Sequence, residues 1–189
     1  RLNAAGRIDD MALGIECLLA DDPATAQQLA QQLDALNRTR RDVESDMLDE
    51  ALAILASFNP GDSHSLAAYQ PGWHIGVIGI LASRLKDKFH RPTIVLASNA
   101  SGELKGSGRS IAGLHLRDAL DLIDKRHPGL ILKFGGHAMA AGLSIPEARY
   151  EEFSQAFETV VRELIDPADL EGVIETDGEL ELSEHRYDL

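Results

Sequence analysis

Apolar side chains recur at three- and four-residue steps between residues 24 and 58, and this spacing predicts one long helix with a single apolar face. The residues on this face are Leu29, Leu33, Leu36, Val43, Met47, Leu48, Leu52 and Leu55. The sequence Asp-Asp-Pro at 21–23 is typical of a helix start, and Asn-Pro-Gly-Asp at 59–62 ends the pattern. At about 1.5 Å per residue the helix would be roughly 50 Å long. Such a length favours a bridge between two domains over a coiled-coil dimer, since Asn37 and Arg40 interrupt the apolar face.

Short apolar runs alternate with helical patterns after residue 65, which favours an α/β layered domain. The predicted strands are 65–69, 93–96, 103–107, 130–134 and 143–145, and the predicted helices are 77–89, 116–123 and 147–165. A short helix that ends near Ala20, capped by Asp9 or Asp10, precedes the long one. Residues 172–182 are typical of one or two further strands.

The charge of the chain is negative overall but unevenly distributed. The net charge of −13 taken alone argues against a nucleic-acid-binding protein. Residues 1–59 carry −6, residues 60–146 carry +4 and residues 147–189 carry −11, so a basic middle lies between two acidic flanks. Cys17 is the single cysteine, which excludes an internal disulfide and a multi-cysteine zinc site. No apolar run approaches the roughly 20 residues of a membrane span, and we expect a cytoplasmic protein without membrane association.

The first segment with candidate chemistry runs from Gly72 to Gly79 and opens a predicted helix. The free amides and the dipole at a helix start favour an anion, and His74 would lie near that start. The alternative interpretation is an ordinary helix start with a packed Trp73 and a hydrogen-bonded His74.

The second segment is a short basic run that we interpret as a tight loop after a strand. Its residues are Lys105, Gly106, Ser107, Gly108, Arg109 and Ser110. The glycines would let the backbone approach a ligand, the serines would donate hydrogen bonds, and the arginine would hold a phosphate bidentately beside the lysine charge. The spacing differs from that of a Walker loop. The segment is therefore either a phosphate cradle or an ordinary charged turn.

Two further segments carry isolated polar groups among small residues. In the first, Gly135 and Gly136 precede His137, which either binds a phosphoryl oxygen or transfers a proton, or else is a satisfied structural histidine. In the second, Arg1, Asn3 and Arg7 form either a polar clamp or a frayed terminus.

The histidines and carboxylates lack the Asp-His-His or His-x-Asp patterns of a metal-dependent phosphoesterase. We therefore expect this chain to supply phosphate-binding groups and to hold no metal itself.

Four segments together resemble the RecJ family of bacterial single-strand-specific 5′→3′ DNA exonucleases, in the DHH phosphoesterase superfamily. They are Arg-Leu-Asn-Ala-Ala-Gly-Arg at 1–7, Trp-His-Ile-Gly-Val-Ile-Gly-Ile-Leu-Ala-Ser-Arg at 73–84, Gly-Ser-Gly-Arg-Ser at 106–110 and Gly-Gly-His-Ala-Met-Ala-Ala-Gly at 135–142. The last is typical of DHHA1 domains throughout the superfamily, and the other segments point to RecJ. The resemblance covers residues 1–146 well.

The resemblance implies a piece of a longer enzyme with an α/β fold: a DHHA1-type mixed sheet with flanking helices, preceded by a long connecting helix. Residues 1–22 would end a DHH domain, 23–59 would be the connecting helix, and 60–168 would be the DHHA1 domain. Residues 169–189 would begin an OB-fold-like module or form a C-terminal strand. The whole enzyme would use Mn²⁺ or Mg²⁺ held by the DHH domain, and this piece alone would be inactive.

The resemblance also implies roles for the residues of the motifs. Ser107 and Arg109 would form the pocket for the 5′-phosphate of single-stranded DNA. His137 would stabilise charge on the scissile phosphate, which Arg1 or Arg7 would face. Trp73 and His74 would line or support the DNA path, and for Trp73 we favour core packing over base stacking. The remaining DNA-binding residues would be Asn3, Lys105, Gly106, Gly108, Ser110, Gly135 and Gly136.

The expected partners are single-stranded DNA with a 5′-phosphate and DNA-repair proteins such as single-strand-binding protein. Two other functions fit the same residues: a DHH/DHHA1 phosphoesterase acting on short oligonucleotides or cyclic dinucleotides, and a non-catalytic nucleic-acid-binding module.

Overall fold

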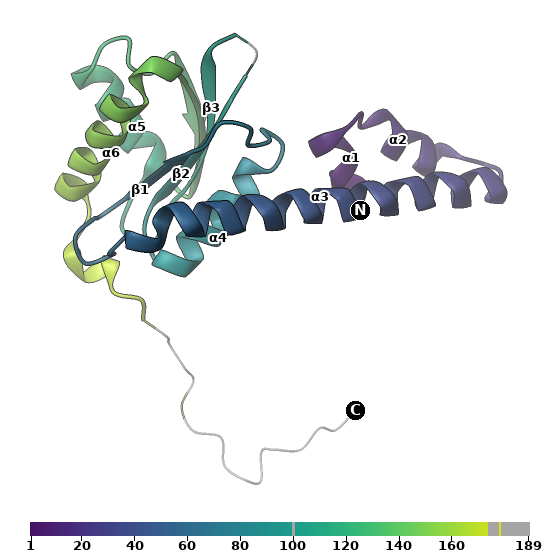
Figure 1. Cartoon of the computed structure of the whole chain (residues 1–189), viewed down its shortest axis with the longest axis horizontal. Coiled ribbons are helices and arrows are strands. Elements are labelled where there is room, and N and C mark those ends of the chain that lie inside the picture. Colours follow the sequence, from purple (N-terminus) through teal and green to yellow (C-terminus); the bar gives the residue numbers. More distant parts are fainter. Residues whose placement is uncertain (100, 174–177, 179–189) are drawn as a thin grey trace.

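A long helix joins a pair of short helices to an α/β unit in the computed structural model, which describes residues 1–99, 101–173 and 178 (Figure 1). The short helices are α1 (Leu2–Ile8) and α2 (Ala12–Leu19), and both pack on the first half of α3 (Pro23–Ile54). A 3₁₀ turn, η1 (Leu55–Ser57), continues α3. Within the described residues no helix is long and apolar enough to cross a membrane.

Helix α3 confirms the long helix predicted from the apolar spacing. It spans 32 residues and begins at Asp22, whose Oδ2 accepts a hydrogen bond from the Thr25 amide at 2.8 Å, with Pro23 in the first turn. Leu33 is buried in the first half, on which α1 and α2 pack, while Met47 and Ala51 are buried in the second half, which packs on the α/β unit. One continuous helix therefore bridges the two ends of the molecule.

The α/β unit is a five-stranded mixed sheet with the strand order β1-β2-β3-β5-β4. Only β1 and β2 are parallel. The strands are β1 (Leu66–Tyr69), β2 (Thr93–Ser98), β3 (Glu103–Arg109), β4 (Lys133–Gly136) and β5 (Ala140–Pro146). The remaining helices are α4 (Ile78–Phe89), α5 (Leu116–Arg126) and α6 (Tyr150–Leu164), with 3₁₀ turns η2 (Glu147–Arg149) and η3 (Pro167–Leu170).

Helices cover both faces of the sheet, so the apolar core has two halves. Ile94 and Leu96 of β2 point into the cluster that contains α5 and α6, while Val95 and Ala97 point into the cluster that contains α3 and α4. This alternation explains why the sequence of β2 is apolar at nearly every position. The predicted α/β layering is confirmed.

Three sequence predictions need correction. The run 105–110, interpreted as a loop after a strand, lies largely within β3, because Leu104 to Arg109 pair with both β2 and β5, and Glu103 pairs with β5. Of the two alternatives for the opening segment, the frayed terminus is wrong, because residues 2–8 form α1 and bury Ala4 and Ala5. The strand predicted at 130–134 begins at Lys133. The strands predicted for 172–182 fall outside the described residues, apart from 172, 173 and 178.

The carboxylate of Glu158 on α6 holds the chain segment that leads into β1. It accepts hydrogen bonds from the amides of His64 and Ser65, at 3.0 and 2.8 Å, and from the Ser65 hydroxyl at 2.7 Å. Arg162 donates a further bond at 2.8 Å. Burial alone would raise the pKa of Glu158, but these hydrogen bonds outweigh it, and the pKa lies below its ordinary value of 4.5.

We expect Glu158→Gln to lower the free energy of unfolding at pH 7 by about 1–3 kcal/mol, the usual effect of weakening hydrogen bonds to a charged group. Because folding lowers the pKa of Glu158, its stabilisation is present above pH 4.5 and is lost as the pH falls through the folded value. Urea unfolding of the variant and wild type should therefore differ at pH 7 and converge at lower pH. Glu151→Gln, an exposed change on the same helix, is the control. A difference that stays constant with pH would contradict this role.

Candidate anion-binding site

The polar side chains of β3 all point to one face of the sheet. Residues alternate along the strand, so Lys105, Ser107 and Arg109 share the face that carries α4, while Gly106 and Gly108 face the opposite helices. A cavity of about 640 Å³ lies beside them. Its lining comes from α1, the start of α4, the β2–β3 turn, β3 and β5: Arg7, Ile75, Gly76, Ile78, Gly79, Asn99, Lys105, Gly106, Ser107, Arg109, Gly142 and Leu143.

Arg109 is a partly buried cation whose hydrogen bonds go only to neutral groups. Its Nη1 donates to Ser107 Oγ at 3.1 Å and to the Gly108 carbonyl at 2.8 Å. No carboxylate of the described chain lies within 4.0 Å of its guanidinium. Burial, and secondarily the charge of Arg7, lower the pKa of Arg109, yet a guanidinium stays protonated at neutral pH. An anion in the cavity would relieve both effects.

Two further cations border the cavity. Lys105 donates to Ser144 Oγ at 2.8 Å and lies 3.2 Å from a Glu103 carboxylate oxygen, so its charge is partly compensated. Arg7, at the end of α1, comes from a part of the chain far from β3 in the sequence. The structure thus brings the opening segment and the basic run of β3 to the same cavity, a contact that the sequence did not predict.

The first turn of α4 completes the cavity. Ile78 and Gly79 line it, and the amides of a first helical turn have no acceptors within the helix. A Cβ atom on Gly79 would lie 3.1 Å from both Arg109 Nη2 and Ser107 Oγ. The hydrogen of Gly79 therefore leaves room for these two polar groups beneath the helix.

The glycines of β3 have a different role from the one expected. A Cβ on Gly106 would lie 2.6 Å from Leu143 Cδ2, and one on Gly108 would lie 2.7 Å from Leu116 Cδ2. Both glycines thus admit core side chains on the face covered by α5 and α6, and their missing side chains do not open the backbone toward the cavity on the opposite face. Ser110 is also buried, and its hydroxyl donates to the Leu114 carbonyl at 2.9 Å.

The Gly-Gly-His segment forms the hairpin between β4 and β5. Gly135 pairs with Gly142, and His137 is exposed in the turn, with its amide donating to the Ala140 carbonyl at 2.8 Å. Ala140 pairs with Arg109 across β5 and β3, so His137 lies at the same end of the sheet as Arg109. Gly136 has a φ of 147°, and a Cβ there would lie 2.4 Å from the Ala140 carbonyl oxygen. Neither Gly136 nor His137 lines the cavity.

Trp73 and His74 lie outside the cavity lining. Trp73 is 5% exposed and packs between α3 and α4, with its Nε1 donating to Glu50 at 2.9 Å. The preference for core packing over base stacking agrees with this burial. His74 is exposed, and its Nδ1 accepts a hydrogen bond from the Gly76 amide at 3.1 Å.

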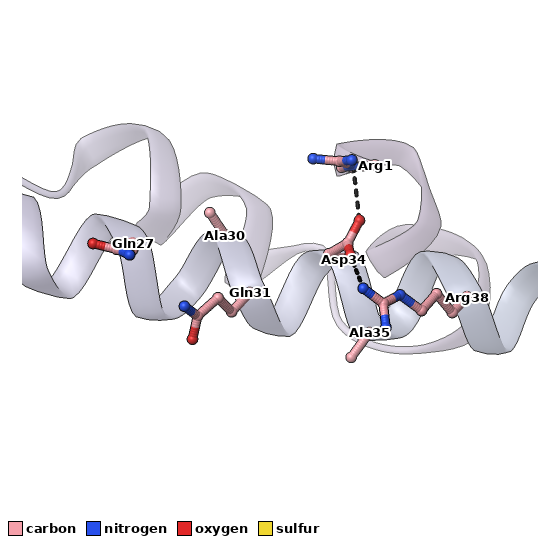
Figure 2. A pocket seen from close by; sticks show the side chains of 7 residues that line it. All are labelled: Arg1, Gln27, Ala30, Gln31, Asp34, Ala35 and Arg38. Atoms are coloured by element: carbon pink, nitrogen blue, oxygen red, sulfur yellow. Dashed lines mark hydrogen bonds and ion pairs between the residues drawn. The ribbon is translucent and has the colours of Figure 1, made fainter.

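Arg1 lies away from Arg109, in a separate hollow of about 360 Å³ between α1 and α3. Figure 2 shows the Asp34 carboxylate between the two guanidinium groups of Arg1 and Arg38, at 2.9 and 2.8 Å. The hydrogen bond from Arg38 and the charge of Arg1 lower the pKa of Asp34. The Asp34 carboxylate already compensates the charges of Arg1 and Arg38, so this hollow is a poorer anion site than the cavity beside Arg109. Asn3 is exposed on α1.

Sequence reasoning missed Gly76, Gly79, Asn99 and Gly142 as parts of the cavity wall. Gly76, Gly79 and Gly142 lie inside the motifs at 73–84 and 135–142, and this position was the only available signal for them. Their place in the cavity depends on contacts between segments that are distant in the sequence. Within the described residues no three or more His, Cys, Asp or Glu side chains gather in a way that could hold a metal ion. The charged side chains that line the cavity are Arg7, Lys105 and Arg109, a set that suits an anion.

Comparison with known proteins supports a specific family. The model of the DHHA1 domain matches residues 62–163. The chain therefore belongs to the DHHA1 domain family.

The chain is 57% identical over 183 residues to the single-stranded-DNA-specific exonuclease RecJ of Dickeya dadantii. The match covers 95% of this chain and 32% of that protein, so the chain spans about a third of its relative. Crystal structures of RecJ from Thermus thermophilus in complex with Mn²⁺ and with Mg²⁺ superpose with TM-scores of 0.76 and 0.77, at 32% and 33% identity. Each covers 88% of this chain, which covers 24% and 25% of those chains, respectively.

We expect Gly79→Ala to weaken binding of inorganic phosphate by about threefold to tenfold, since a methyl group would crowd Arg109 Nη2 and Ser107 Oγ, the two polar atoms expected to bind the anion. Alanine is the better helix former, so the folding stability should stay equal or rise. A chemical-shift titration with phosphate measures the affinity, and Gly14→Ala in α2, whose Cβ would meet only side-chain atoms at 3.5 Å or more, is the control. Equal affinities of the Gly79→Ala variant and wild type would show that the anion binds elsewhere.

Proposed function

We propose that this chain forms the DNA-end-binding part of a metal-dependent 5′→3′ exonuclease specific for single-stranded DNA. The likeness to RecJ proteins supports the enzyme class, because those relatives are named single-stranded-DNA-specific exonucleases. Since the chain spans about a third of these relatives, the activity is proposed for a longer protein that contains it. RecJ structures with Mn²⁺ or Mg²⁺ support the metal dependence, and we place that metal in a part outside this chain.

The observation that carries the proposal is the Arg109–Ser107 pair on the cavity wall without a carboxylate partner in the described chain. A terminal phosphate monoester carries a charge of about −1.5 to −2 at pH 7, whereas an internal phosphodiester carries a single charge. Arg109, Arg7 and Lys105 together present three cations to one cavity. Such a site favours the strand end over an internal phosphate, and it would select a 5′-phosphate.

The other motif residues take supporting roles in this proposal. Arg7 is the arginine of the opening segment that acts on the bound phosphate, because Arg1 is engaged by Asp34. His137 lies at the Arg109 end of the sheet and stabilises charge on the scissile phosphate. Gly135 and Gly142 pair across β4 and β5, and their missing side chains leave room for the DNA strand beside the sheet. Trp73 supports the DNA path from within the core, and His74 supports it from the exposed turn before α4.

Replacing Arg109 tests the proposal. We expect Arg109→Ala to weaken binding of a 5′-phosphorylated single strand by about ten- to a hundredfold, the cost of a charge-assisted bidentate contact. Binding of the same strand with a 5′-hydroxyl should change far less. Arg109→Lys keeps the charge but loses the planar fork of the guanidinium. Its affinity for the 5′-phosphorylated strand should therefore lie between those of wild type and Arg109→Ala.

Fluorescence anisotropy of this chain with the two labelled strands measures the preference, and degradation rates of the longer protein test its consequence. Arg117→Ala is the matched control, since Arg117 is an exposed arginine on α5, across the sheet from the cavity. An Arg109→Ala variant that keeps the full 5′-phosphate preference would rule out this pocket.

The salt dependence gives a second prediction. Each phosphate contact made by a cation adds about 0.7 to the slope of log K against log salt for a single strand. We expect the slope to fall by about this amount in Arg109→Ala and to remain unchanged in Arg117→Ala. Equal slopes for wild type and Arg109→Ala, measured between 50 and 200 mM salt as a rough range, would mean that Arg109 makes no phosphate contact.

A further inference from the structure

We propose that Gly76 is a positioning residue for Arg7: it lets the end of α1 dock against the turn before α4, and this contact sends the Arg7 side chain into the cavity. The inference rests on the proposed phosphate site. Gly76 lies in the segment 73–84 and lines the cavity, and the proposed phosphate site gives it no role of its own.

The contact is closest at the backbone. A Cβ atom on Gly76 would lie 1.7 Å from the carbonyl oxygen of Arg7 and 2.7 Å from its carbonyl carbon. Both neighbours are backbone atoms at the end of a helix, so no side-chain rotation could relieve the overlap. Any residue other than glycine must therefore move the end of α1 away from the turn.

Helix α3 contacts both partners of this contact, α1 and the turn before α4. Helix α1 buries Ala4 and Ala5 and packs on the first half of α3. The turn is tied to the second half, where Trp73 is buried in the core and donates to Glu50. The hydrogen bond from the Gly76 amide to His74 Nδ1 then fixes the turn itself.

The contact of Gly76 with Arg7 joins the turn directly to α1, so that α1, α3 and the turn all contact one another. Arg7 lines the cavity at that junction, and its charge acts on Arg109. A displaced α1 would withdraw one of the three cations while leaving β3, Ser107 and Arg109 in place. Gly76 thereby sets how well the two arginines act on one anion.

A double-mutant cycle tests the inference. We expect Gly76→Ala and Arg7→Ala each to weaken binding of a 5′-phosphorylated single strand by about threefold to tenfold. The double variant should bind no more weakly than Arg7→Ala alone, because both changes remove the same contribution. Gly61→Ala is the matched control: Gly61 also lies in a turn, and a Cβ there would meet only the Asn59 side chain, at 3.4 Å or more. It should bind like wild type.

A second measurement reports on α1 without any ligand. Hydrogen exchange of the amides in residues 2–9 should be faster in Gly76→Ala and unchanged in Gly61→Ala. If Gly76→Ala fails to fold, Trp73→Phe replaces it, since that change removes the Nε1 donor to Glu50 at the start of the same turn. It should show the same coupling to Arg7→Ala in a milder form.

The outcomes separate the two proposals. Wild-type affinity and wild-type exchange in Gly76→Ala, or losses that simply multiply in the double variant, would overturn the role of Gly76. An Arg7→Ala variant that binds like wild type would also overturn it, because no contribution of Arg7 would be left to position. Failure of the proposed function shows instead in Arg109→Ala, and faster exchange in α1 would still support the docking contact.

Discussion

The geometry of the basic cavity depends on the packing of one helix, α3, against the rest of the molecule. Its second half buries Met47 and Ala51 against α4 and the sheet, and its first half carries α1. Glu44 reinforces the junction, because it pairs with Arg40 on α3 and receives Arg84 of α4 at 3.3 Å. At about 1.5 Å per residue α3 is about 48 Å long. Because its two ends pack on the α/β unit and on α1, the helix determines where Arg7 lies relative to β3. Changes in α3 packing would act on the cavity without touching it.

Strand β3 separates structural and binding tasks by its two faces. On one face Gly106 and Gly108 make room for Leu143 and Leu116, so the sheet approaches α5 closely. On the other face Ser107 and Arg109 point toward α4, where Gly79 leaves them uncovered. A central strand paired on both sides is among the most rigid supports that a fold offers. The alternation of glycine with polar residues is therefore explained by two different contacts and not by one glycine-rich loop.

Much of the architecture could be predicted from periodicity alone, because burial of an apolar face leaves a direct trace in the sequence. The apolar spacing that includes Leu33 and Met47 predicted the long helix, and the apolar run at 93–96 predicted strand β2. Contacts between distant segments leave no such trace. The sequence could not distinguish Arg1 from Arg7, since the difference lies in Asp34 and in the turn at Gly76. The strand predicted at 103–107 is confirmed, but the interpretation of 105–110 as a loop was wrong, because glycine suggests a turn unless the partner side chains across the sheet are known.

The acidic composition and the basic cavity serve the same selectivity. A net charge of −13 offers a polyanion no general attraction, so the proposed binding of a strand end depends on local contacts. Binding must then come from local contacts, which are strongest where Arg109, Arg7 and Lys105 line one cavity. Charged groups farther apart than about 8–10 Å are largely screened at physiological salt, so the acidic faces do not cancel this local field. A cavity lined by three cations therefore favours a ligand that concentrates its charge at one point, as a terminal phosphate does, over one that spreads its charge along a backbone.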